Sequence, residues 1–141
     1  MADVCVPTQD EFFAECRRAF EFLKDYQFEE VLPPRHRRGN RFTVWFRAGE
    51  RSVVIEGEGW GTMVRVHLEH DSGVRIAEIY LVPLEARPIR TKRKPVARGQ
   101  LEEIRLGAER VRQHTTDFLT GDLKRFLDLA APLPSYLQEK R

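Results

Sequence analysis

The sequence predicts an α+β fold. In it, an N-terminal helix precedes a four-stranded antiparallel meander sheet, and a C-terminal helix plus a short helix follow the sheet. Near both ends of the chain, apolar residues recur at three- and four-residue spacing, which is the period of an amphipathic helix. Between residues 40 and 82 the apolar residues alternate instead, and short turns containing glycine interrupt the alternation. We expect the helices to pack on one face of this sheet.

Length and composition fit a single domain over residues 1–141. A chain of 141 residues, 41% of them apolar, can bury enough surface for a core of its own. The composition excludes a fibrous repeat and a disulfide scaffold, and no apolar run is long enough for a membrane span. The chain contains two cysteines and shows no signal-peptide pattern, so we expect a cytoplasmic protein that does not bind membranes.

The first predicted helix covers residues 9–26. Thr8 and Glu11 form a capping box, in which the hydroxyl and the carboxylate each accept a hydrogen bond from a free backbone amide. The apolar stripe that follows consists of Phe12, Cys16, Ala19, Phe20 and Leu23. Cys16 lies in this stripe and is therefore expected to be a small buried hydrophobe rather than a reactive thiol.

The alternating region predicts four strands, at residues 41–47, 51–56, 62–69 and 74–82. If each pair of consecutive strands is joined by a two-residue turn, Val44 pairs with Ile55 and Phe46 with Val53. The next pairs are Ile55 with Val64, then Leu68 with Ala77 and Val66 with Ile79. Because alternate side chains point to opposite faces, this register gathers Val44, Ile55, Val66 and Ile79 on one apolar face beneath the helices.

The opposite face of the predicted sheet is mixed in character. It holds Thr43, Trp45, Arg47, Val54, Glu56, Met63, Arg65, His67, Glu78 and Tyr80. In the predicted register His67 faces Glu78, and Arg65 faces Tyr80. We expect this semi-apolar face to be covered by a helix or to bind a partner through Trp45, Arg65 and Tyr80, a second copy of the chain being one such partner.

A second helix is predicted over residues 100–119, with Gly107 weakening it by about 1 kcal/mol relative to alanine. Residues 120–122 predict that this helix ends and that a short helix begins after them, with Leu123, Phe126 and Leu127 as its apolar residues. Pro132 and Pro134 end that helix, and residues 132–141 are expected to form a loose tail.

The glycine cluster at residues 57–61 predicts a hairpin turn rather than a phosphate-binding loop, because it leads into a strand and not into a helix. Trp60 lies at the tip of this turn. An exposed indole is a frequent contact residue in protein interfaces, so Trp60 is a candidate for partner binding.

The sequence shows no catalytic or metal-binding motif. His67, His70 and Asp71 resemble a ligand trio, but residues three apart on a strand point to opposite faces. Glu56, Glu58 and Glu69 form a carboxylate set toward which we expect no second element to point. We therefore expect no enzyme activity, metal or cofactor. An enzyme whose site is assembled from residues distant in the sequence is the remaining alternative.

Two basic segments flank the predicted sheet. The first, residues 35–41, contains Arg35, Arg37, Arg38 and Arg41, and the second is a proline-containing loop at residues 85–98. The basic residues of the second segment are Arg87, Arg90, Lys92, Arg93, Lys94 and Arg98. A segment with clustered cations is either a solvated surface loop or a binding site for an acidic or phosphate-bearing partner. The second segment is therefore a candidate protein-binding site, and the two together are a candidate nucleic-acid surface.

The chain resembles small bacterial α+β proteins of the immunity-protein kind, many of which are encoded beside toxin genes. The resemblance lies in the helix exit at residues 22–28 (FLKDYQF), the hairpins rich in valine and phenylalanine, and the helix break at residues 118–122 (FLTGD). It implies a module that binds another protein, here a toxin. Inhibitors of nucleases are commonly acidic, whereas this chain has a net charge of +2, so toxins other than nucleases are the more natural partners.

Overall fold

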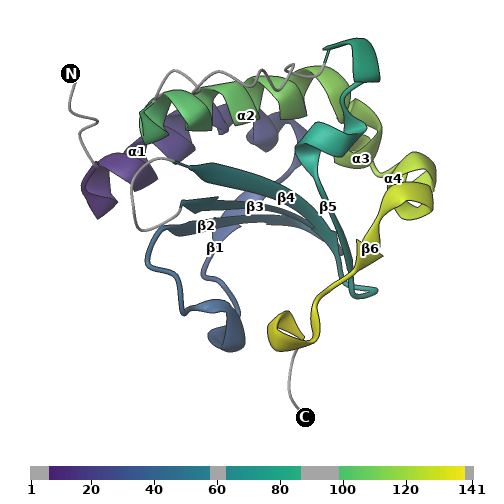
Figure 1. Cartoon of the computed structure of the whole chain (residues 1–141), viewed down its shortest axis with the longest axis horizontal. Helices are drawn as coiled ribbons and strands as arrows, with labels where there is room; N and C mark the ends of the chain where they lie inside the picture. Colours follow the sequence, from purple (N-terminus) through teal and green to yellow (C-terminus); the bar gives the residue numbers. More distant parts are fainter. Residues whose placement is uncertain (1–6, 58–62, 87–98, 139–141) are drawn as a thin grey trace, which may run out of the picture.

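The computed structural model describes residues 7–57, 63–86 and 99–138, which form helices packed on one face of an antiparallel sheet (Figure 1). The sheet has six strands in chain order, β1-β2-β3-β4-β5-β6. The strands are β1 (Glu29–Val31), β2 (Thr43–Ala48), β3 (Arg51–Gly57), β4 (Val64–His70), β5 (Val74–Ala77) and β6 (Ala131–Pro132). The α+β class and the antiparallel meander are confirmed. The predicted count of four strands is too low, because the two edge strands β1 and β6 are too short to show an alternating pattern.

The helices are α1 (Gln9–Ala19), α2 (Gln100–His114), α3 (Thr116–Thr120) and α4 (Lys124–Leu129). Short 3-10 helices connect the elements: η1 (Glu21–Tyr26), η2 (Arg35–Arg37), η3 (Glu78–Leu81), η4 (Leu84–Ala86) and η5 (Ser135–Leu137). In the described residues, no helix combines the length and the apolar character that a membrane crossing requires.

The N-terminal helix begins as predicted but is shorter. The amide of Glu11 donates to Oγ1 of Thr8 (3.1 Å), and the amide of Thr8 donates to Oε1 of Glu11 (3.0 Å). After Ala19 the chain tightens into η1 and leaves it through Gln27, which adopts a left-handed conformation with φ 67°. Cys16 is fully buried, and this burial raises the pKa of its thiol, in agreement with its predicted role in the core.

The predicted register is confirmed for the first hairpin, where Val44 pairs with Ile55. In the second hairpin Ile55 pairs with Val66 instead of Val64. This shift of two residues leaves each side chain on its predicted face, because side chains alternate with a period of two.

The third hairpin differs from the prediction by one residue, and this changes which face its side chains occupy. His70 pairs with Val74, so the turn has three residues, and it closes through Gly73 in a left-handed conformation (φ 90°). Leu68 therefore pairs with Ile76 instead of Ala77. The strand also ends at Ala77, not at residue 82, because residues 78–81 form η3. The predicted pairs of Val66 with Ile79, of His67 with Glu78 and of Arg65 with Tyr80 consequently do not form.

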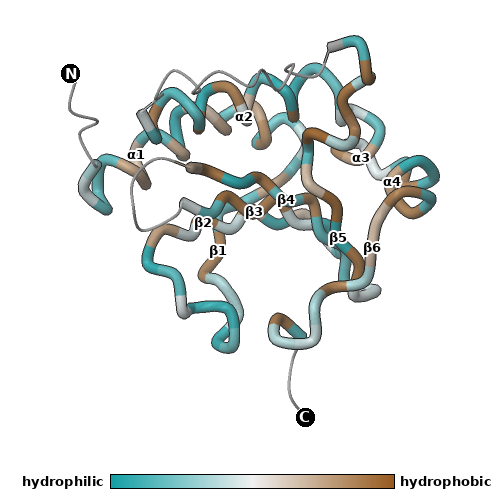
Figure 2. The backbone as a smooth tube through the Cα atoms, viewed as in Figure 1, coloured by the Kyte–Doolittle hydropathy of each residue, from teal (hydrophilic) through white to brown (hydrophobic). Residues whose placement is uncertain are grey.

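Helices α1 and α2 cover one face of the sheet and turn their apolar sides toward it (Figure 2). Ile104 and Val111 of α2 are fully buried in the same core as Ile55 and Leu68. Gly107 brings α2 close to the sheet, since a Cβ at this position would lie 2.8 Å from Cγ2 of Val66. The predicted continuous helix breaks after His114. Thr115 then starts α3, whose Phe118 packs on Phe126 of α4 with ring centroids 4.8 Å apart.

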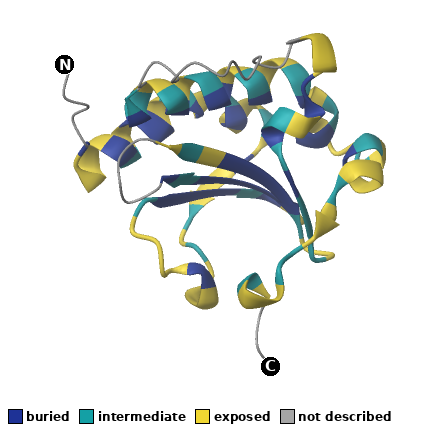
Figure 3. Cartoon of the chain, viewed as in Figure 1, coloured by how far each residue is buried: buried dark blue, intermediate teal, exposed yellow. Residues whose placement is uncertain are grey.

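The strands are buried on both faces in the middle of the sheet, although only one face carries α-helices (Figure 3). The second face is concave, and η2 and η5 lie beside it (Figure 1). Residues 131–138, most of which were expected to form a loose tail, instead make β6 and η5. Here the amide of Leu133 donates to the carbonyl of Gly73 (2.8 Å). This arrangement places polar side chains on a sheltered sheet face.

Candidate functional site

The concave face, turned away from α1 and α2, aligns polar and apolar side chains in three cross-strand rows. Pairing places Arg47, Ser52, Glu69 and Arg75 in one row, Trp45, Val54, His67 and Ala77 in the next, and Thr43, Glu56 and Arg65 in the third. Ser52, His67 and Glu69 are buried there, beside the fully buried Val54. Ionisable groups are thus held in a layer where packing alone would favour apolar residues.

Arg37 of η2 joins this layer from the concave side of the sheet, opposite α1 and α2 (Figure 1). Its Nη1 and Nη2 donate to the two carboxylate oxygens of Glu69 at 2.9 and 2.8 Å, and the side chains are only 4% and 5% exposed. The guanidinium also lies over the ring of Trp45, 4.9 Å from its centroid. The expectation that Arg37 belongs to a solvated basic surface is wrong, because the carboxylate of Glu69 compensates its charge inside the fold.

Glu56 and His67 lie next to this ion pair. Nη2 of Arg37 is 3.8 Å from Glu56, and Nε2 of His67 is 4.0 Å from the other carboxylate oxygen of Glu56. Burial raises the pKa of Glu56, although Arg37 opposes this effect. Burial, reinforced by the positive charges of Arg75 and Arg65, lowers the pKa of His67 to about 4.

His67 is therefore neutral at neutral pH, and its ring can both donate and accept a hydrogen bond. Among the described residues, Nδ1 of His67 and Oγ1 of Thr43 are buried without a hydrogen-bond partner. Buried polar atoms are nearly always paired, so these two atoms are the candidates on this face for a hydrogen bond to a ligand, a partner or a water molecule.

A pocket of about 550 Å³ opens on the concave face between β5, η3 and the chain around β6. We call it the β5 pocket, and its principal lining residues are His67, Arg75, Tyr80, Leu129, Pro132 and Pro134. In the part of the chain that the structure describes, Arg75 has neither a hydrogen bond nor an ion pair. A second hollow of about 750 Å³ lies between η2 and η5 and includes Arg37, Trp45 and Glu69 in its lining.

A further hollow, of about 670 Å³, lies between η1 and β1. Phe20 and Phe46 are among its lining residues, and both are buried core residues. At its margin, Nε of Arg17 donates to Glu30 at 2.7 Å. The charged residues that line this hollow are exposed, whereas Arg37, His67 and Glu69 on the concave face are buried, so the concave face is the stronger candidate site.

The structure separates the residues that the sequence suggested for partner binding. Trp45 is only 5% exposed, packs against Arg37, and offers little surface to a partner. Arg65 is exposed on the concave face, and Tyr80 is 59% exposed beside the β5 pocket. Trp60, Arg87, Arg90, Lys92, Arg93, Lys94 and Arg98 lie outside the described residues.

The histidines do not converge on a metal. His70 contacts Ser72 (2.8 Å) and Glu50 (3.3 Å) at the end of β4, while His67 points to the concave face. Over residues 7–57, 63–86 and 99–138, no group of histidine, cysteine and carboxylate side chains is arranged to hold a metal ion.

Sequence reasoning did not find Arg37, Arg75 or the 129–134 segment as parts of one site. These residues reach the concave face from η2, β5 and the end of α4, which are far apart in the chain. The available signal was the carboxylate set that includes Glu56 and Glu69, and the expectation that no second element points toward it is wrong, because Arg37 of η2 reaches both residues. No family model, curated protein or solved structure matches the chain.

Proposed function

We propose that the chain is a non-catalytic protein-binding module that receives its partner on the concave face, as an immunity-like protein that neutralises a toxin would. The observation that carries this proposal is a polar layer beside two open hollows, formed by the buried Arg37, Glu69 and His67 and the half-buried Glu56. Buried ion pairs give little net stability compared with apolar packing. A buried ion pair beside a hollow is therefore better explained by a role in binding a partner than by a role in stability.

Large apolar side chains near the concave face support a protein as the partner. Tyr80 and Leu129 border the β5 pocket and are 59% and 54% exposed, and Tyr136 of η5 is 74% exposed. Protein interfaces combine such apolar and aromatic anchors with polar groups that fix orientation.

Affinity capture from the source organism tests this proposal. The baits are the wild type, Leu129→Ser and Tyr136→Ser, and the matched control is Leu84→Ser on η4. Leu84 is also an exposed leucine (73%), but it lies on the helix side of the molecule (Figure 1). We expect the wild type and the control to retain a partner that both concave-face variants lose.

A partner retained equally by all four baits overturns docking on the concave face. A partner lost only with Leu84→Ser places the interface near residues 85–98 and also contradicts the proposal. For the immunity-like role, the captured partner is expressed in a bacterial host. We expect it to arrest growth, and wild-type protein, but not Leu129→Ser, to relieve the arrest.

Nucleic-acid binding is the alternative, supported by the exposed arginines Arg35, Arg38 and Arg41. Arg37, which this alternative counted among its phosphate contacts, instead donates from both of its terminal nitrogens to Glu69. Filter binding between low and physiological salt tests it, since phosphate contacts predict a steep loss of affinity with salt. Absence of binding even at low salt rejects this alternative.

A further inference from the structure

The β5 pocket contains a guanidinium whose donors are available. Pairing of β4 with β5 sets Arg75 directly opposite Glu69, the residue that would ordinarily neutralise it. Arg37, however, engages both carboxylate oxygens of Glu69. Within the described residues Arg75 forms no ion pair with Glu69 or with any other carboxylate, and its side chain is half-buried. Its planar set of N–H donors matches the geometry of a carboxylate.

The buried His67 adds a second, independent feature. Its side chain is 10% exposed, it lines the same pocket, and its Nδ1 has no hydrogen-bond partner among the described residues. A neutral imidazole supplies polar contacts without adding a second positive charge. This combination suits a singly charged anion better than a phosphate dianion.

The remaining walls of the pocket are apolar. Besides His67 and Arg75, the lining consists of Ile76, Ala77, Leu129, Ala131, Pro132 and Pro134, together with the ring of Tyr80. A volume of about 550 Å³ lies within the range of small-ligand sites, which are mostly apolar with a few polar groups that orient the ligand.

We propose that the β5 pocket binds a carboxylate carried on a short apolar body, with the carboxylate against Arg75 and the apolar body against Leu129, Pro132 and Pro134. This inference rests on the concave face being the binding face, as in the proposed function. The carboxylate belongs either to a free organic acid or to an acidic residue or C-terminus of the partner protein.

Titration of the purified full chain with 3-phenylpropionate tests the pocket without any partner. We expect saturable binding with a Kd of about 1 mM or tighter, as for a small ligand with one ion pair and one ring. The matched probe is 3-phenylpropanamide, which has the same apolar body without the charge, and we expect it to bind about tenfold more weakly. Backbone amide NMR shifts should report the contact at Ala77 and Ala131.

Arg75→Gln and Arg47→Gln form the matched variants. Arg47 lies in the same cross-strand row, but outside the β5 pocket, and its side chain pairs with Asp71 (2.5 Å). We expect Arg75→Gln to reduce the affinity for the carboxylate to that for the amide, and to leave amide binding unchanged, which shows that the pocket is intact. Arg47→Gln should bind both probes as the wild type does. Equal binding of the two probes, or undiminished carboxylate binding by Arg75→Gln, overturns the proposal.

Capture with Arg75→Gln as bait separates the two sources of the carboxylate. Loss of the partner assigns the carboxylate to the partner protein, and retention of the partner together with loss of probe binding assigns it to a free organic acid. Failure of the probe titration overturns the pocket alone, whereas failure of the Leu129→Ser and Tyr136→Ser captures overturns the proposed function.

Discussion

Arg37 is the residue by which η2 is held against the sheet. Both of its terminal nitrogens donate to Glu69, and its guanidinium lies on Trp45, so one side chain joins a loop to β2 and β4. Such a pair adds little beyond what apolar packing would give, yet breaking it is costly, because removing one charge leaves the other buried without compensation.

Arg37→Ala should therefore lower the free energy of unfolding by about 3–5 kcal/mol. Urea denaturation followed by tryptophan fluorescence measures this change. Arg35→Ala, at an exposed position on the same short helix, is the control and should stay within about 0.5 kcal/mol of the wild type. A loss for Arg37→Ala no greater than that of the control would show that the ion pair does not anchor η2.

His67 makes stability depend on pH. Burial lowers its pKa in the folded chain to about 4, from an ordinary value of 6.5. The unfolded chain therefore takes up a proton before the folded chain does. The stability that His67 contributes is fully present above about pH 6.5 and is lost as the pH falls toward 4. The charged groups that face His67 on the concave face are Arg37, Glu56, Arg65, Glu69 and Arg75.

Between pH 7 and pH 4 the wild type should lose about 3 kcal/mol more stability than His67→Gln, at 1.36 kcal/mol for each unit of pKa. Urea titrations at several pH values measure the difference. His36→Gln, at an exposed position, should follow the wild-type profile. Parallel profiles for the wild type and His67→Gln would contradict a depressed pKa.

At the scale of elements, the close approach of α2 to β4 depends on Gly107. Sequence reasoning identified this glycine only as a weak point in a helix, whereas the structure supplies its role, which is contact with Val66. Helix propensity and packing thus favour opposite outcomes for Gly107→Ala.

Gly107→Ala should destabilise the protein by up to about 2 kcal/mol, because overpacking of 1–3 kcal/mol outweighs a propensity gain of about 1 kcal/mol. Thermal or urea unfolding measures this. In a Val66→Ala background, where the opposing methyl group is removed, the same substitution should become stabilising. If Gly107→Ala destabilises equally in both backgrounds, the contact with Val66 is not the cause.

The elements also show why the sequence predicted the first hairpin well and the third poorly. The two central strands have long alternating patterns, and a shift of two residues in the second hairpin left their faces unchanged. The third hairpin depended on turn length alone, and the left-handed Gly73 closes a loop of three residues instead of two. One residue was enough to move Ala77 to the concave face. The edge strands, at three and two residues, are shorter than any pattern can reveal.

At the scale of the whole molecule, the candidate site could not be predicted from local patterns, because its residues come from η2, the four strands β2 to β5, and the end of α4 with the segment after it. Alternation predicted that Glu56 and His67 share a face. It could not predict that Arg37 would arrive from a loop, or that Arg75 would lose its neighbour Glu69 to that loop. Such contacts follow from tertiary packing alone.

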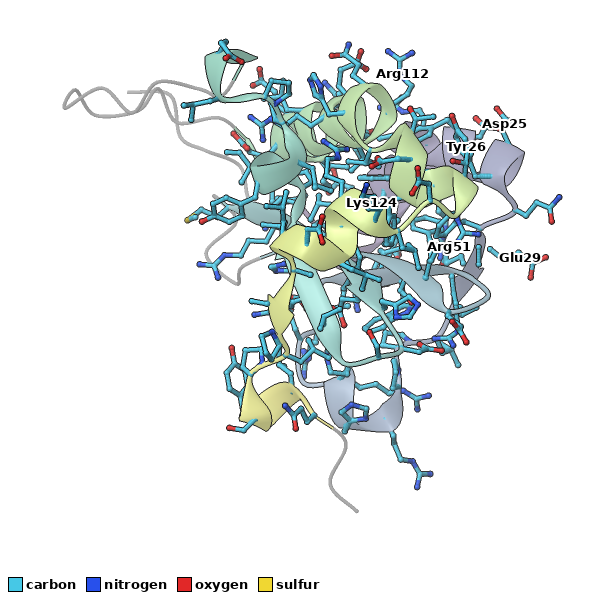
Figure 4. All side chains as sticks on the ribbon, turned by 90° about the vertical axis from the view of Figure 1, so that its right-hand side faces the viewer. Asp25, Tyr26, Glu29, Arg51, Arg112 and Lys124 are labelled. Carbon is cyan, nitrogen blue, oxygen red and sulfur yellow. The ribbon has the colours of Figure 1, made fainter. Side chains whose placement is uncertain are left out.

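Arg51, the first residue of β3, connects the sheet to the helical layer on the side of the molecule shown in Figure 4. Its Nη1 donates to the carbonyls of Phe118 (2.9 Å) and Leu119 at the end of α3, and its guanidinium lies 5.3 Å from the ring centroid of Phe28. One side chain therefore joins β3, the segment before β1, and α3.

Arg51→Ala should lower the free energy of unfolding by about 1.5–3 kcal/mol, the range for hydrogen bonds that involve a charged group. Urea denaturation measures the global loss of stability, and hydrogen exchange of the α3 amides measures the loss of stability within α3. Arg112→Ala is the control, since Arg112 is 53% exposed and pairs with Glu109 within its own helix. Unchanged exchange in α3 for Arg51→Ala would show that this side chain does not join the two layers.

The outermost strands also bear on how the protein behaves at high concentration. An open sheet leaves unpaired backbone groups along its two borders, and these can recruit strands from other molecules into aggregates. Here one border is β1, with Glu29 and Glu30 in its three residues, and the other is β6, where Pro132 lacks an amide proton. The charge of Glu29 at one border and the missing donor at the other both disfavour pairing with a strand from another copy.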